Sequence, residues 1–250
     1  MSVFKKIYSW DFWQAISGAY MGIFMIMHVF THATAIFGKE SNETAYVTLR
    51  AIYQNINFEI IFVISLIIHG YTGFKKWYSR YKLRELMKHK SQGKSFIKEI
   101  FNDIRNPKKI NRYMGWILLG IIIVHINGTR IEPIMYIGYN KSKLLDGSLM
   151  YVELSELGIF SKILITTYMM YLPFGIYHTL YGMNLNVKTL MRIKFIDLYS
   201  IIWLWVFIIG IIFTIFVIMG YTGKIYDVNI SPKQRELVTP IADHIRHMIS

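Results

Sequence analysis

The sequence predicts an all-α integral membrane protein with five transmembrane helices in a bundle. Of its 250 residues, 54% are hydrophobic, and the mean hydropathy of +0.34 is too apolar for an ordinary soluble domain. The apolar residues are grouped in blocks of about 20, enough to cross about 30 Å of hydrocarbon at about 1.5 Å per residue. The blocks comprise residues 12–37, 57–78, 113–137, 159–183 and 198–222.

The first block is expected to run outward and the second to return. No charged segment, short apolar core and small-residue cleavage site precede the first block, so we expect no removable signal peptide. Gly18 and Gly22 leave room on one helix face for another helix or a flat cofactor. The polar stretch from Gly38 to Ile56 is expected to hold a short surface helix. Glu59 then complements the dipole of the second helix, with proton exchange at the outer surface as the alternative.

The remaining blocks complete the predicted domain organisation. Residues 79–112 form a Lys-rich inside loop, partly helical, that is suited to anionic lipid or to a soluble partner. Pro133 should change the course of the third helix, which starts at Tyr113, and Pro173 should kink the fourth. The fifth helix carries no acidic or basic residue and is expected to face lipid. A transmembrane domain, residues 1–222, is thus followed by a polar tail, residues 223–250.

Charge and cysteine content exclude several classes of function. The net charge of +13 invites a nucleic-acid interpretation, but 18 of the 28 Lys and Arg residues fall on one predicted side of the membrane. The positive-inside rule explains this distribution and places the N-terminus inside and the C-terminus outside. We therefore expect lipid contact and no nucleic-acid partner. Because there is no cysteine, disulfides, thiolate metal sites and thioether-attached haem are excluded.

Four histidines lie inside four different apolar blocks: His28, His69, His125 and His178. An ionisable side chain in hydrocarbon costs free energy unless it is hydrogen-bonded or bound to metal. One such residue is explained equally well by a contact between helices, but four, one per helix, favour a function. A haem iron takes two axial ligands on opposite faces of a flat ring, so its histidines must come from facing helices.

Depth along the alternating helices sorts these histidines into two pairs. A rise of about 1.5 Å per residue places His28 and His125 about 24 and 18 Å from the inner side. The same rise places His69 about 13 Å and His178 about 8 to 15 Å from that side. We therefore predict an outer haem on His28 and His125 and an inner haem on His69 and His178. His32 shares a helix face with His28 and cannot be its partner across a ring, so it either lines the outer site or makes a simple hydrogen bond.

The stretch from Asp11 to His28, DFWQAISGAYMGIFMIMH, resembles the first helix of a known family. Gly115 ten residues before His125 and Gly182 four after His178 are similar as well. The family comprises the di-haem cytochrome b membrane anchors of succinate:quinone oxidoreductases and quinol:fumarate reductases, also called respiratory complex II. The resemblance covers the five helices and is weaker in the basic loop and the tail.

The resemblance implies two b haems, with the first and third helices ligating the outer one and the second and fourth the inner one. It also implies a flavoprotein with FAD, an iron-sulfur subunit, quinone (ubiquinone or menaquinone) as substrate, and room for further small anchor subunits. Gln14, and residues near Lys188, would face the propionates of the inner haem. The membrane would be a bacterial cytoplasmic membrane or a mitochondrial inner membrane. The chain itself would be a non-catalytic electron-transfer subunit of a succinate dehydrogenase.

Two departures from the family favour succinate oxidation. Ile176 stands where some fumarate reductases carry a glutamate two residues before the fourth ligand, and Arg50 stands where an outer-loop glutamate is linked to quinol oxidation. The alternatives are a quinol:fumarate reductase anchor and another di-haem quinone-reacting cytochrome, as in formate dehydrogenases or hydrogenases. A more distant alternative is a haem-free transporter or assembly protein that uses its histidines for protons or substrate.

Overall fold

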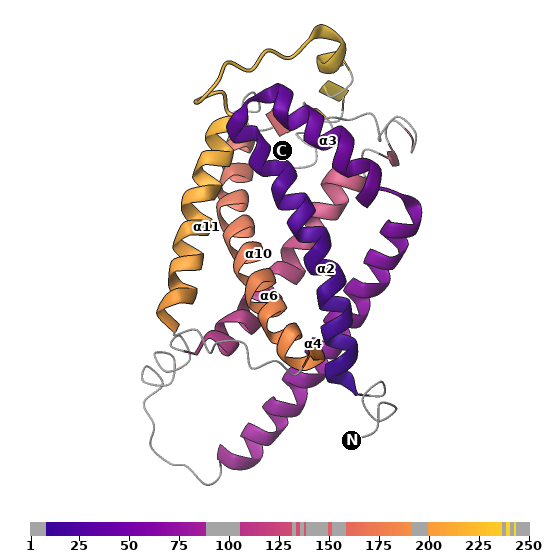
Figure 1. The fold of residues 1–250 in the computed structure, drawn as a ribbon, viewed down its shortest axis with the longest axis vertical. Helices are drawn as coiled ribbons and strands as arrows, with labels where there is room; N and C mark the ends of the chain where they lie inside the picture. The colour runs from indigo at the N-terminus through magenta and orange to yellow at the C-terminus, as the bar shows by residue number, and fades with distance from the viewer. Residues whose placement is uncertain are drawn as a thin grey trace.

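The computed structural model describes residues 9–88, 106–131, 134, 135, 138, 150, 151, 159–191, 200–236, 239, 240 and 243. Within these residues the protein is helical and contains no strand. The long helices are α2 (Trp10–Ala33), α4 (Ile56–Lys88), α6 (Pro107–Ile126), α10 (Ile159–Met191) and α11 (Ser200–Tyr221). They lie side by side along the long axis of the molecule (Figure 1).

Four of these segments are long and apolar enough to cross a membrane. They are Trp10–Phe37, Ile56–Leu83, Pro107–Ile131 and Ile202–Tyr221. Their outward faces carry large exposed apolar side chains, among them Ile64 and Ile67 of α4 and Ile209 of α11. Such a surface suits lipid and not water. The prediction of a helical membrane protein is therefore confirmed at this level.

Helices α2 and α6 begin at recognisable capping residues. The Ser9 side chain accepts a hydrogen bond from the Phe12 amide at 3.2 Å, and Asp11 lies in the first turn of α2. Asn106 caps α6 in the same way, at 3.1 Å from the Lys108 amide, with Pro107 as the first helical residue. A side-chain oxygen at this position satisfies a backbone amide that has no partner within the helix.

Helices α2 and α10 form the centre of the bundle. Helix α2 packs against α3, α4 and α10, and α10 packs against α2, α6 and α11. Helices α4 and α6 meet through side chains. Trp116 of α6 contacts the rings of Phe74 and Trp77 of α4. At the upper end, Arg130 and Glu59 form an ion pair at 2.6 Å.

The upper end of the bundle is covered by short elements. Helix α2 continues into η1 (Thr34–Phe37), and Gly38, with a positive φ of 103°, turns the chain into α3 (Lys39–Tyr53). This is the surface helix that the sequence predicts. The end of α11 lies so close to η1 that a Cβ at Gly220 would collide with the Ala35 carbonyl oxygen.

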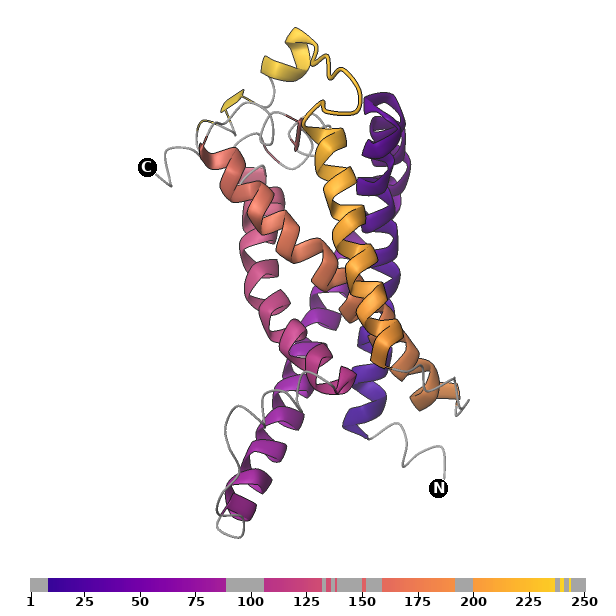
Figure 2. The ribbon, with the colours of Figure 1, turned by 90° about the vertical axis from the view of Figure 1, so that its left-hand side faces the viewer.

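Residues that follow α11 cross the same end of the bundle as α3 (Figures 1 and 2). The Lys39 ammonium donates hydrogen bonds to the Asn229 carbonyl at 2.7 Å and to the Gln234 side chain at 3.0 Å. Gln234 in turn donates to Glu43 at 2.9 Å, and Lys39 pairs with Glu43 at 3.1 Å. The beginning of the polar tail is thus attached to α3 by a small polar cluster.

Two expectations from the sequence need correction. The first concerns where helices begin and end around residues 79–112, which the sequence predicts to be a partly helical loop: α4 runs on to Lys88, and α6 begins at Pro107, six residues before the expected start. The 33 residues of α4 span about 50 Å, so the helix extends beyond the bundle (Figure 2). Residues 89–105 lie outside the described part of the chain.

The second correction concerns α11, which is not simply a wall facing lipid. Trp203, Thr214, Val217 and Tyr221 are buried, whereas Trp205 is exposed. Its buried face packs on α10, where a Cβ added at Gly210 would lie 3.4 Å from Cα of Pro173. Every face of α11 carries apolar residues of its own. The pattern of apolar residues in the sequence therefore cannot show which face is buried.

Candidate haem-binding site

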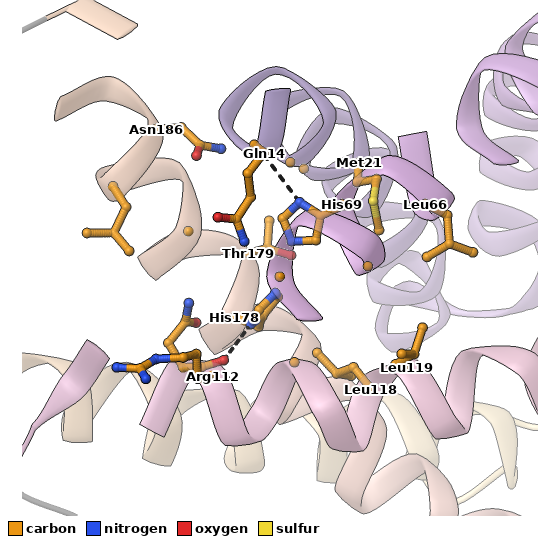
Figure 3. A pocket seen from close by; sticks show the side chains of 18 of the residues that line it. Gln14, Met21, Leu66, His69, Arg112, Leu118, Leu119, His178, Thr179 and Asn186 are labelled. Atoms are coloured by element: carbon orange, nitrogen blue, oxygen red, sulfur yellow. Dashed lines mark hydrogen bonds between the residues drawn. The ribbon is translucent and has the colours of Figure 1, made fainter. Parts of the chain in front are cut away.

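A cavity of about 500 Å³ lies among α2, α4, α6 and α10. Its volume is within the range of about 300–1,000 Å³ that is usual for small-molecule and cofactor sites. His69 of α4 and His178 of α10 line it, as does Gln14 of α2 (Figure 3). Glycines from all four helices contribute to its wall. They are Gly18, Gly22, Gly70, Gly73, Gly115, Gly175 and Gly182.

The two inner histidines face each other across this cavity. Their ring centres are 6.2 Å apart and their planes are nearly perpendicular, at 89°. A bond of about 2 Å from each imidazole nitrogen to a shared metal, plus the two ring radii, would separate ring centres by about 6 Å. The side chains are therefore spaced as two ligands of one metal would be.

Hydrogen bonds fix the tautomer of both inner imidazoles. His69 donates from Nδ1 to the Gln14 carbonyl oxygen at 3.3 Å, and His178 donates from Nδ1 to the Asn111 carbonyl oxygen at 2.9 Å. A carbonyl can only accept, so the proton is on Nδ1 and Nε2 keeps its lone pair. A metal-binding histidine usually has this arrangement, since the second nitrogen holds the ring in place.

Two glycines make room for these imidazoles. A Cβ added at Gly18 would lie 2.9 Å from Cε1 of His69, and one added at Gly115 would lie 2.9 Å from Cε1 of His178. At Gly70 and Gly182, which also line the cavity, an added Cβ would meet only open space. The cavity thus has the features that a flat ring between two imidazoles requires, and the inner residues fit a haem.

Basic and amide side chains gather at the lower end of the cavity. Lys76 forms an ion pair with Asp11 and donates a hydrogen bond to the Gln14 side chain. Arg112 and Asn186 also line this end. Gln14 lines the same cavity as His69 and His178, and its contact with a propionate stays a prediction. The side chain of Lys188 lies outside the described residues.

The outer pair lies toward the upper end of the bundle and does not line this cavity. The ring centres of His28 and His125 are 5.8 Å apart, at an angle of 72°. Aromatic rings stack on both of them: Phe24 on His28 and Tyr171 on His125. Nδ1 of His28 is buried and has no hydrogen-bond partner in the described part of the chain. Both predicted pairs are thus brought together, and ligation by them stays a prediction.

One residue near the outer pair, Tyr53, could not be found from the sequence pattern. Tyr53 at the end of α3 lies with its ring centre 6.0 Å from that of His28. Burial raises the pKa of Tyr53, although the Arg50 guanidinium and a hydrogen bond with Thr31 act in the opposite direction. Tyr53 therefore remains neutral near pH 7. No periodicity linked it to His28, since it belongs to a different element.

Comparison with known proteins gives no relative. No protein-family model matches the sequence, no curated protein matches it, and no solved structure matches the fold. No group of three or more His, Cys, Asp or Glu side chains within the described residues is arranged to hold a metal ion by itself. The fold and the site define only a broad class, helical proteins with segments suited to span a membrane and two pairs of closely spaced histidines.

Proposed function

We propose that this protein is the membrane-anchor cytochrome b subunit of a succinate:quinone oxidoreductase. In this proposal α10 is the fifth spanning helix, and the bundle holds two b haems with two histidine ligands each. The observation that carries it is the inner pair: His69 and His178 face each other across a cavity with Nδ1 of each ring bound to a backbone carbonyl.

The side chains of the chain have distinct roles in this proposal. His69 and His178 would hold the inner haem, and His28 and His125 the outer one. Haem supplies a one-electron carrier whose potential depends on its ligands and surroundings. The backbone carbonyls of Gln14 and Asn111 orient the inner imidazoles, and Lys76 and Arg112 place positive charge where an anionic haem edge would lie.

The partners follow from the same proposal. A flavoprotein with FAD and an iron-sulfur subunit would lie on the inner side, where α4 extends beyond the bundle with Arg80 and Lys82 on its surface. Quinone would exchange electrons within the membrane. The membrane would be an energy-transducing one, with the N-terminus inside and the C-terminus outside.

Purification of the protein with its associated subunits tests the proposal. We expect a Soret band, a low-spin b-type difference spectrum, two haems per chain, and reduction by succinate through co-purified flavin and iron-sulfur subunits. A formate- or hydrogen-reducible complex would instead identify another di-haem cytochrome. A haem-free protein would contradict the proposal and favour a transporter or an assembly protein.

A further inference from the structure

A third imidazole lies beside the predicted outer pair. His32 follows His28 by one turn of α2, and the two ring centres are 4.7 Å apart. Nε2 of His32 lies 3.3 Å from Nε2 of His28. His32 is also far inside the protein, with an exposed fraction of 3%. A role on the lipid-facing surface is therefore excluded.

Residues from two other elements hold His32 in place. Nδ1 of His32 lies 2.8 Å from the hydroxyl of Tyr221, a fully buried residue in the last turn of α11. Asn42 of α3, which is also fully buried, donates to the Tyr221 hydroxyl at 3.4 Å and to the Thr31 carbonyl at 2.7 Å. The orientation of the His32 ring is thus determined by α2, α3 and α11 together.

The position of the His32 ring shares one feature with that of the inner histidines. In His69, His178 and His32, an oxygen atom lies within hydrogen-bond distance of Nδ1, and Nε2 is left toward a neighbouring imidazole or the cavity. In His28 the buried Nδ1 has no such partner among the described residues. The Tyr221 hydroxyl can accept a hydrogen bond from Nδ1 of His32. With the proton on Nδ1, Nε2 of His32 keeps its lone pair, as in a metal-binding histidine.

We propose that His32 is a second imidazole ligand of the outer haem, able to bind the iron opposite His125 in place of His28. This inference rests on the proposed function. His28 and His32 lie one turn apart on the same side of α2, so they cannot be the two axial ligands of one iron. One of them binds at a time, and exchange replaces one neutral imidazole by another.

The test uses haem content and spectra of the purified complex, with the inner haem as an internal control for folding. We expect His28→Ala to keep about two haems per chain, with a shifted spectrum of the outer component. The double variant His28→Ala/His32→Ala should retain about one haem per chain. In the His28→Ala background, Tyr221→Phe should lower retention of the outer haem. Tyr226→Phe, which changes an exposed tyrosine five residues later, should not.

The outcomes separate this inference from the function on which it rests. If the unmodified protein carries two haems but His28→Ala loses the outer one, alone or with the inner one, His32 is not a ligand and the proposed function stands. If the double variant keeps both haems, His32 is likewise excluded. If the unmodified protein carries no haem, the proposed function fails and this inference fails with it.

Discussion

The imidazole of His178 lies directly against Gly115: a Cβ at this glycine would be 2.9 Å from Cε1 of the ring. The contact joins α10 to α6 beside the Asn111 carbonyl that accepts the hydrogen bond from His178. A side chain at position 115 must therefore displace the imidazole ring, even though His178 itself is unchanged. The helix positions and the imidazole orientation are coupled at this point.

Gly115→Ala is expected to impair the inner haem site selectively. The new methyl group pushes His178 away from its position opposite His69, so the haem content should fall from two per chain toward one. Gly120→Ala is a matched control, because it lies on the same helix and an added Cβ there meets nothing within 4 Å. Alanine improves helix propensity by about 1 kcal/mol at either position. Equal haem content in the two variants would contradict the role assigned to Gly115.

The pairing of histidines predicts which substitutions share a phenotype. His69→Ala and His178→Ala should each remove the same spectral component, because the two rings face one another at 6.2 Å. His125→Ala should remove the other component and leave the first intact. Redox difference spectra of the three variants measure this directly. If His69→Ala and His125→Ala abolished the same component, the pairing would be wrong.

Much of the bundle follows from local signals in the sequence. Apolar block length predicts the long helices, and helix direction with a constant rise places His28 near His125 and His69 near His178. The rings of both pairs are indeed close, at 5.8 and 6.2 Å. Depth is available from the sequence because it depends only on counting residues from the membrane surface.

Contacts between residues far apart in the sequence could not be predicted from block length or from depth. Tyr221 lies 189 residues from His32, and helix α11 is apolar on every face, so nothing in its pattern marks this tyrosine as facing inward. The sequence predicts that the basic stretch is partly helical, but it does not show that α4 runs unbroken to Lys88, for a different reason. The helix continues after its apolar block ends, and a change from apolar to basic residues marks the membrane surface, not the end of a helix.

The absence of cysteine allows a direct test of orientation. Lys82→Cys near the lower end of α4 and Lys224→Cys after α11 each introduce one exposed thiol. We expect a membrane-impermeant maleimide to label Lys224→Cys in right-side-out vesicles and Lys82→Cys in inside-out vesicles only. The unmodified chain is the blank, since it has no thiol to label. Labelling of both variants in one vesicle orientation would contradict an odd number of spans between these positions.

The Glu59 to Arg130 ion pair should stabilise the upper end of the bundle. Both side chains are largely buried, at 24% and 17% exposure, and they join α4 to the π-helical turn η2 (Asn127–Ile131) that follows His125. Glu59→Gln removes one counter-ion of Arg130 in a poorly solvated place. We expect Glu59→Gln to cost about 1–3 kcal/mol, less than the cost of breaking a fully buried pair.

Thermal unfolding in detergent measures this cost against a matched control. Glu59 and Glu40 each lie in the first turn of a helix, so both lose the same favourable interaction with a helix dipole when changed to glutamine. Glu40 is exposed, and Glu40→Gln should lower the Tm much less than Glu59→Gln. The double variant Glu59→Gln/Arg130→Gln should recover part of the loss, because the cation that lost this ion pair is then removed as well. Equal Tm values for the two single variants would show that the pair contributes nothing beyond the dipole interaction.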